Sequence, residues 1–401
     1  MCSSVFKVTK RPFWILPTIV LSQFACTSLW FAGNAVLGDI QQLWGLGNDV
    51  LSYMTSSVQL GFIVGTLLFA FFTISDRFSS RIVFFTCSLL GALSNLCIHL
   101  IANDLASLLL FRFLTGFFLA GIYPVGMKIA AGWYHKGLGG AMGFLVGATV
   151  VGTGFPHLLK SLGVSLPWEF VILTVSGISV IGGVLILLLV PDGPYLTSGT
   201  TFNSRAFLLI FKSKDLRCAA FGYFGHMWEL FTLWAFIPVF LSQYSGANML
   251  TLNVSFWTFC IIAIGFVGCS GGGLLSKKAG SPSVAFYQLS ASAICCLLSP
   301  MMFHGSVELC LIFLLFWGIV VVGDSPQFSA LTAQTAPQEL VGSALTIVNS
   351  IGFFITIISI QFTNYLTNFL HPKYIFLFLI PGPIFGLIYL WPLLKRKDKT
   401  G

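Results

Sequence analysis

Charged residues are the scarcest class in this sequence. Only 8% of the 401 residues are Asp, Glu, Lys or Arg, whereas 56% are hydrophobic and 15% are aromatic. Soluble globular domains carry about 25% charged residues, so the composition excludes a soluble fold. The net charge of +8 is spread over short segments between apolar stretches. This distribution is typical of a membrane topology signal and argues against nucleic-acid binding.

The patterns of metal sites and ATP-driven enzymes are also missing. The sequence has ten cysteines but no Cys-x-x-Cys, and its six histidines are scattered. We therefore expect no metal, no cofactor and no enzymatic active site. No Walker-type Gly-x-x-x-x-Gly-Lys-Ser/Thr sequence occurs, so an ATP-driven pump would need a separate subunit.

Long apolar stretches are what the sequence has in abundance. A stretch of about 20 apolar residues is long enough to cross a bilayer as a helix. Twelve such stretches lie at approximately 13–38, 50–74, 82–102, 105–127, 138–160, 168–190, 218–243, 251–275, 283–303, 307–331, 340–367 and 373–394. They are continuous, whereas an outer-membrane barrel would show short segments of alternating polarity. The sequence predicts an all-α polytopic membrane protein with twelve transmembrane helices.

The basic residues between these stretches predict the orientation. If the helices alternate, one side collects Lys7, Lys10, Arg11, Arg77, Arg81, Lys136, Arg205, Lys212, Lys214, Arg217, Lys277, Lys278, Lys395, Arg396, Lys397 and Lys399. The other side offers mainly Lys160 and Lys373 among acidic residues. The positive-inside rule then places both termini in the cytoplasm of a plasma (inner) membrane protein.

The longest polar interval divides the chain into two halves. It begins with Pro191-Asp192-Gly193-Pro194, a strong helix-breaking cluster. We expect six helices in residues 1–190, a cytoplasmic loop at 191–217 with a segment at the membrane interface, and six helices in 218–401. We expect the protein to be a monomer.

The two halves repeat each other. At a spacing of 202 positions, Gly116, Gly121, Pro124 and Gly140 recur as Gly318, Gly323, Pro326 and Gly342. Internal repeats in a very apolar chain indicate a secondary transporter with its substrate site between the repeats. The charges are not repeated: at the same spacing Leu314 stands opposite Arg112 and Ile122 opposite Asp324. In the corresponding loop of the second half, 201 positions on, Lys277 stands where Asp76 stands in the first. We expect function where the halves differ.

Two short motifs carry a family resemblance. The loop after the second stretch supplies Asp76, Arg77 and Arg81, and the fourth stretch supplies Arg112, Gly116, Gly121 and Pro124. Together they resemble the signature loop and the fourth-helix motif of the major facilitator superfamily (MFS). Phe72 and Ser79 replace two glycines of that loop. The resemblance implies two pseudo-symmetric six-helix bundles and transport by alternating access.

The loop motif suits a cytoplasmic gate. Asp76 can pair with Arg77, with Arg81 or with a neighbouring helix end, and such pairs can break when the halves move. The alternative is that the arginines only follow the positive-inside rule and Asp76 caps the third helix. These two interpretations are compatible.

Ionisable residues inside apolar stretches are the strongest functional signal, because they are costly in a bilayer. Glu229 and His226 are three residues apart and share a helix face, so we expect proton coupling there, with a buried polar network as the alternative. The resemblance associates Arg112 with proton coupling or anion binding, and snorkelling to the surface is the alternative. Asp324 either joins the pathway or satisfies the helix disruption at Pro326.

The resemblance also implies that the first, fourth, seventh and tenth helices line a central cavity. It would place Gln23, Trp30, Asn34, Trp228 and Trp234 around a substrate, with packing against other helices as the alternative for each tryptophan. We expect a small polar, zwitterionic or cationic solute, with protons as a second partner and the bilayer as the surroundings. A facilitative carrier, a drug or metabolite exporter, and a non-transporting receptor or scaffold remain the alternatives.

Overall fold

The computed structural model describes residues 12–134, 138–163, 166–195 and 203–397. Within these ranges every regular element is a helix. Five of the basic residues used for the topology, Lys7, Lys10, Arg11, Lys136 and Lys399, lie outside the described part of the chain.

The N-terminal half contains ten helical segments. They are α1 (Ile15–Thr27), α2 (Ala32–Ala35), α3 (Leu37–Trp44), α4 (Val50–Phe71), α5 (Ile74–Arg77), α6 (Ser80–Leu100), α7 (Leu105–Leu119), α8 (Tyr123–Trp133), α9 (Leu138–Ser161) and α10 (Trp168–Leu189).

The rest of the chain contains nine α-helices and two 3₁₀ segments among the described residues. They are α11 (Arg205–Lys212), α12 (Lys214–Ala247), α13 (Val254–Ala263), α14 (Gly265–Ala279), α15 (Ser281–Met302), α16 (Val307–Gly323), α17 (Ser325–Thr335), η1 (Gln338–Leu340), α18 (Val341–Thr367), η2 (Pro372–Leu379) and α19 (Pro381–Lys397).

Eleven helical spans of the described chain are long and apolar enough to cross a membrane, and α1 adds a shorter one. The predicted all-α fold with twelve transmembrane helices is confirmed. The first span differs from its expected course over 13–38, because helix α1 ends at Thr27 and the chain resumes as α2 at Ala32.

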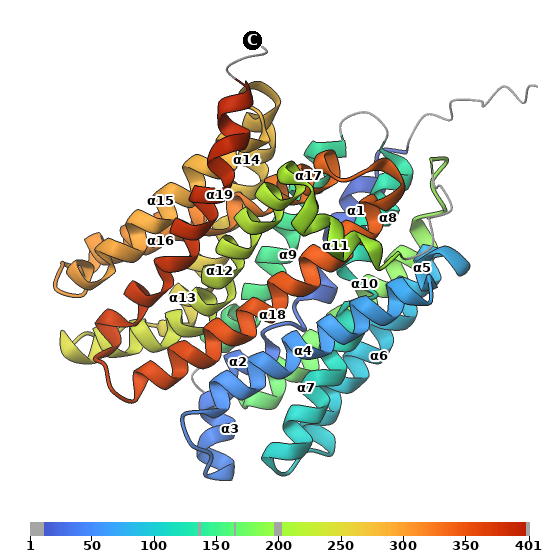
Figure 1. Cartoon of the computed structure of the whole chain (residues 1–401). Coiled ribbons are helices and arrows are strands. Elements are labelled where there is room, and N and C mark those ends of the chain that lie inside the picture. The colour runs from blue at the N-terminus through green and yellow to red at the C-terminus, as the bar shows by residue number, and fades with distance from the viewer. Residues whose placement is uncertain (1–11, 135–137, 164–165, 196–202, 398–401) are drawn as a thin grey trace, which may run out of the picture.

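The two halves lie side by side across the molecule (Figure 1). Helices α4, α6 and α7 lie at the lower right of the picture, and α15, α16 and α19 at the upper left. The end at the top, where α1 begins and α19 ends, is called the terminal face, and the end where α3 lies is called the opposite face. The halves meet where α9 packs on α13 and α14, and where α4 packs on α18.

Repeated glycines allow equivalent helices to cross closely in each half. A Cβ atom at Gly116 of α7 would lie 2.0 Å from the carbonyl oxygen of Val58 in α4. A Cβ atom at Gly318 of α16 would lie 2.0 Å from the carbonyl oxygen of Ile261 in α13. Each contact leaves no room for a side chain, so the repeat preserves backbone packing.

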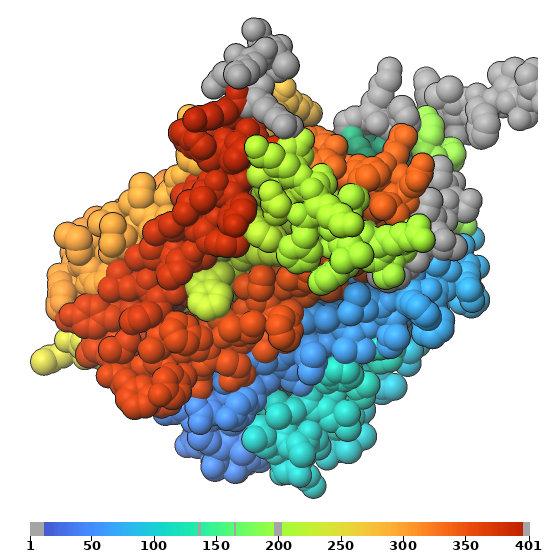
Figure 2. All heavy atoms as spheres, viewed as in Figure 1, coloured from blue at the N-terminus to red at the C-terminus, as the bar shows by residue number. Residues whose placement is uncertain are grey.

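Helix α11 lies on the surface beside the terminal face. Its residues Ala206 and Ile210 are buried, whereas Phe207, Leu208 and Phe211 are exposed. Figure 2 shows this segment in yellow-green over the orange α18, which it contacts. An exposed apolar side next to basic residues suits a helix at the membrane interface.

Candidate functional site

Arg112 closes the break in the first helix. Its Nη1 donates to the carbonyl oxygen of Leu29 at 3.1 Å, and its Nη2 donates to the carbonyl oxygen of Trp30. Non-helical backbone at membrane depth must have its polar groups satisfied inside the protein. The side chain of Arg112 is fully buried, so it does not snorkel to the surface. Two of its guanidinium nitrogens are therefore bound to the backbone, and its buried Nε has no hydrogen-bond partner among the described residues.

His226 pairs with Asp324, not with Glu229. The Nδ1 atom of His226 lies 2.9 Å from Oδ1 of Asp324, and both side chains are only 1% exposed. Asp324 stands at the junction of α16 and α17, immediately before the segment that begins with Ser325 and Pro326. This contact between a basic and an acidic side chain has both partners buried, unlike the other such contacts described below, and it is an ion pair only when the imidazole is protonated. His226 Nε2 and Asp324 Oδ2 have no hydrogen-bond partner in the described part of the chain.

Glu229 belongs to a separate polar cluster. Its Oε1 accepts hydrogen bonds from Ser292 Oγ at 2.5 Å and from Trp317 Nε1 at 2.8 Å, and the Sγ of Cys296 lies 3.4 Å away. These partners come from α15 and α16, so the cluster lies inside the C-terminal half. Glu229 lines neither of the two cavities described next. This arrangement matches the alternative of a buried polar network.

Two neighbouring cavities lie between the halves. The vestibule has a volume of about 400 Å³. It is lined at the opposite face by Phe31 and by residues of α2, α3, the start of α4, the second half of α12 and the ends of α9 and α13. An ion pair in its wall joins Lys160 Nζ to Asp39 Oδ2 at 2.6 Å. The aromatic cavity has a volume of about 40 Å³. Its lining residues are Trp30, Tyr123, Val146, Thr149, Val150, Thr153, Tyr223, Met227, Leu230, Phe231, Trp234, Val322, Ser325 and Phe353.

Aromatic rings from both halves form the boundary between the two cavities. Trp234 lines both of them, and Phe31 beside it lines the vestibule. The ring of Trp30 stacks on Phe353 with 5.6 Å between centroids, and its distance to Phe231 is also 5.6 Å. Trp30 belongs to the N-terminal half and its two partners to the C-terminal half, so a movement between the halves must separate these rings.

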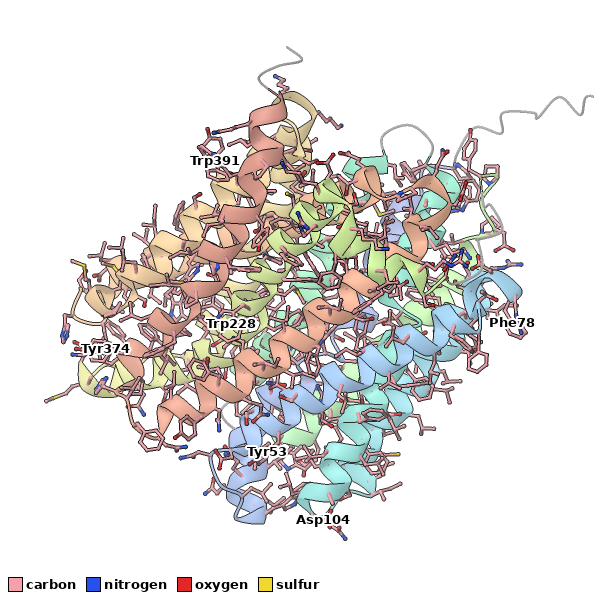
Figure 3. All side chains as sticks on the ribbon, in the orientation of Figure 1. Tyr53, Phe78, Asp104, Trp228, Tyr374 and Trp391 are labelled. Carbon is pink, nitrogen blue, oxygen red and sulfur yellow. The ribbon has the colours of Figure 1, made fainter. Side chains whose placement is uncertain are left out.

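The other predicted substrate residues lie in different places. Asn34 lines the vestibule and donates to Thr55 Oγ1 at 2.7 Å. Gln23 does not line the aromatic cavity but donates to Oγ1 of its lining residue Thr149 at 3.2 Å. Trp228, labelled in Figure 3, lines neither cavity, because its Nε1 donates to the carbonyl oxygen of Phe378 at 3.1 Å.

The loop motif is held inside the N-terminal half. Asp76 pairs at 2.5 Å with Lys128 of α8, a residue that the sequence alone did not single out as its partner. Arg81 lies 3.9 Å from Asp192, which also accepts from Ser79 Oγ at 2.8 Å. Arg77 donates to Thr73 Oγ1 at 3.1 Å. Asp76 is placed inside the short helix α5, whereas the N-cap of α6 is Ser79.

Comparisons with known proteins point to one family. A family model described as the Major Facilitator Superfamily matches residues 19–360. The structure is similar to that of the proton:xylose symporter XylE, with a TM-score of 0.75, 13% identity and 95% of each chain covered.

Two further structures are similar over almost the whole chain. The human organic anion transporter MFSD10 gives a TM-score of 0.72 and 14% identity, with 94% of this chain and 98% of that chain covered. A bacterial homolog of the human lysosomal transporter Spinster gives a TM-score of 0.69 and 14% identity, with 97% of this chain and 98% of that chain covered. No curated protein sequence matches the chain. At these identities, the structural likeness shows the fold alone.

Proposed function

The chain belongs to the major facilitator superfamily, and from this we propose that it is a secondary active transporter coupled to protons. It is an integral membrane transporter and not an enzyme. We propose that it moves a small polar organic solute by alternating access. The observation that carries this proposal is the pair of adjoining cavities between the halves, which share Trp234.

The contacts around the cavities support alternating access from the opposite face. The vestibule reaches that face, whereas α9 and α14 pack closely near the terminal face. A Cβ atom at Gly273 of α14 would lie 3.6 Å from the carbonyl oxygen of Gly139 in α9. Rocking of the halves would separate these helices and open the aromatic cavity to the terminal face. In this proposal the pair of Asp76 and Lys128 keeps α5 and α8 together as the N-terminal half moves.

We assign proton coupling to His226 and Asp324. A buried carboxylate and imidazole 2.9 Å apart can gain or lose a proton with a large change in local charge. Tyr223 and Glu229 of α12, Tyr123 of α8 and Cys269 of α14 are the other titratable groups that lie close enough to interact electrostatically within this region. The pair lies beside Tyr223, which lines the aromatic cavity. Protonation can therefore affect solute binding directly.

The coupling can be tested in proteoliposomes with an imposed pH gradient. The probes would be radiolabelled alanine, choline, nicotinate, nicotinamide and xylose. We expect at least one of them to accumulate against its gradient. Asp324→Asn and His226→Gln should each lower this accumulation at least about ten-fold while solute exchange continues. Glu229→Gln should retain most of it, because an amide oxygen can still accept from Ser292 and Trp317.

Each other outcome rejects a defined part of the proposal. If no probe accumulates or exchanges, transport of a small polar solute is rejected. Exchange without accumulation would indicate a facilitative carrier. Normal solute accumulation by Asp324→Asn and His226→Gln would reject the assignment of proton coupling to this pair. Loss of accumulation in Glu229→Gln alone would assign coupling to Glu229.

We also propose that the terminal face is cytoplasmic, in a plasma (inner) membrane, and that the transporter is a monomer. Arg77, Arg81, Lys277 and Lys278 lie in short segments at the terminal face, whereas Lys160 at the opposite face is paired with Asp39. This asymmetry is the one that the positive-inside rule requires. Labelling of single cysteines introduced at either face of intact cells tests the orientation.

A further inference from the structure

Each charged group near the two cavities contacts another protein group, although Arg112 Nε, His226 Nε2 and Asp324 Oδ2 have no hydrogen-bond partner among the described residues. The guanidinium of Arg112 is bound to backbone carbonyls, and Asp324 is paired with His226. In the vestibule wall, Lys160 is paired with Asp39. The described lining of the aromatic cavity includes no Asp, Glu, Lys or Arg. A solute that enters this cavity with a net charge would contact no Asp, Glu, Lys or Arg side chain in its described wall.

The aromatic cavity does offer unused hydrogen-bond donors. Trp30 and Trp234 both line it and are each 3% exposed. Their indole Nε1 atoms are buried and have no partner in the described part of the protein. A buried N–H without an acceptor costs free energy, so these two atoms mark where a solute oxygen or nitrogen can accept. The two residues lie one in each half, 204 positions apart, each as the second residue of a Leu-Trp pair.

Two threonine hydroxyl groups in the cavity lining supply hydrogen-bond acceptors. The hydroxyl of Thr149 donates to the carbonyl oxygen of Leu145 at 3.1 Å, and that of Thr153 donates to the carbonyl oxygen of Thr149 at 2.8 Å. Because these hydroxyl protons are used by the backbone, the two oxygens can accept from a solute N–H, and Thr149 Oγ1, which already accepts from Gln23, keeps one lone pair for this. The cavity therefore combines N–H donors with acceptor oxygens and aromatic faces.

The ring contacts between the halves specify a flat solute. Trp30 contacts Phe231 and Phe353 across the two halves. Opening the cavity separates these rings, and a planar molecule between them would replace the lost aromatic contact. The present volume of about 40 Å³ is little more than that of one water. A solute would thus enter from the vestibule by displacing the rings of Phe31 and Trp234.

We propose that the solute is an uncharged, planar heteroaromatic or amide-bearing molecule, whose acceptor atoms bind the indole N–H groups of Trp30 and Trp234. This inference rests on the proposed transport function and narrows its substrate class. It replaces the zwitterionic or cationic solute expected from the embedded charges, because those charges are bound elsewhere.

Binding to the purified full-length protein tests the class with one matched series. The probes are nicotinamide, nicotinate, the ring-N-methylated cation of nicotinamide, and xylose, measured by isothermal titration calorimetry. Nicotinamide should bind, and its anionic and cationic analogues should bind roughly a hundred-fold or more weakly, since a buried charge without a partner is costly. Xylose should bind weakly, because it is not planar.

Tryptophan variants test the donors. Trp30→Phe and Trp234→Phe keep an aromatic ring but remove the N–H, and each should weaken nicotinamide binding about five-fold. Trp228→Phe is the matched control and should leave binding unchanged, because its N–H is bound to Phe378 outside the cavities.

The outcomes separate this inference from the proposed function. Binding of a charged analogue as tight as that of nicotinamide overturns the uncharged class, as does the absence of nicotinamide binding. Equal binding by Trp30→Phe, Trp234→Phe and wild type overturns the donor assignment. If a charged probe accumulates in proteoliposomes, the proposed transport function is supported and the uncharged solute class is rejected. Nicotinamide binding without any flux would uphold the class and reject transport.

Discussion

The first helix of the N-terminal half is interrupted, whereas its counterpart in the C-terminal half is continuous. Helix α1 ends at Thr27 and the chain resumes at Ala32, but α12 runs unbroken from Lys214 to Ala247. Arg112 donates hydrogen bonds to the backbone carbonyls at the interruption. The equivalent residue of the repeat is Leu314, whose side chain has no hydrogen-bond donor. The N-terminal half uses its embedded charge to bind its own backbone, whereas the C-terminal half carries the buried His226–Asp324 pair, to which we assign proton coupling.

The shared features of the halves concern geometry and not charge. Helices α7 and α16 begin 202 positions apart, and so do α8 and α17. Each of the latter begins with a proline in its first turn, where a missing N–H costs nothing. At this junction Asp324 stands opposite Ile122. The same backbone break is therefore apolar in one half and carries the proposed proton site in the other.

The largest loss of stability should follow from replacing Arg112 by leucine, the residue at the equivalent position of the C-terminal half. Arg112→Leu leaves the carbonyls of Leu29 and Trp30 without donors in an apolar interior. We expect a loss of about 2–5 kcal/mol of stability and a melting temperature in detergent lower by roughly 5–10 °C. Scanning fluorimetry of the purified protein measures the change.

A neutral donor distinguishes the backbone role from a ligand role. Arg112→Gln removes the charge but keeps an N–H donor, so it should recover part of the lost melting temperature. Wild-type stability in Arg112→Leu would show that the two carbonyls do not depend on this side chain. No recovery in Arg112→Gln would indicate that the positive charge itself is required.

A smaller loss of stability, equal in the two halves, should follow from adding a methyl group at the repeated glycines of the helix crossings. Gly116→Ala and Gly318→Ala each place a Cβ atom 2.0 Å from a carbonyl oxygen of the crossing helix. Because backbone atoms must move apart, we expect each change to cost about 1–3 kcal/mol. Melting temperatures of the two variants test whether the shared packing is equally important on both sides.

Open glycines in each half provide matched controls. A Cβ atom at Gly177 of α10 or at Gly271 of α14 would meet nothing within 4 Å. Alanine at either position should be neutral or stabilise by about 0.5–1 kcal/mol. A clear asymmetry between Gly116→Ala and Gly318→Ala would contradict the conclusion that the repeat preserves packing.

Much of the fold could be predicted because its signals are local or periodic. Apolar stretches of membrane length predicted the spans, and the repeat of Gly116 and Gly318 predicted equivalent scaffolds in the two halves. The interruption of the first helix could not be predicted, because residues 28–31 contain no proline or glycine. Its stabilisation comes from Arg112, 83 positions after Leu29.

The partners of the embedded charges also could not be predicted from the sequence, because they come from distant parts of the chain. His226 and Glu229 share a helix face by spacing, but this helix packs on several others. His226 meets Asp324 at the α16–α17 junction, while Glu229 meets Ser292 and Trp317 on the far side. The sequence predicted which residues are unusual, but tertiary packing decided their partners.

The smallest effect concerns the helix caps that stand at equivalent positions of the halves. Asp104 begins α7 and accepts from the backbone N–H of Ser107 at 2.8 Å, whereas Ser306 begins α16 and accepts from Leu309 N–H at 3.4 Å. Hydrogen bonds from the side chain and then the backbone of Ser107 lower the pKa of Asp104 below its ordinary value. Its capping is therefore present above the unfolded-state pKa of about 3.9 and is lost as the pH falls through the lower folded-state pKa.

The variant Asp104→Ser copies the cap of the other half and removes this titration. Between about pH 4.5 and pH 3, the melting temperature of the wild type should fall slightly more steeply than that of the variant. Other carboxylates contribute equally to both proteins, so the difference between the two curves isolates Asp104. Parallel curves would show that this exposed cap does not contribute to stability, and that the two halves tolerate either capping residue because packing alone positions α7 and α16.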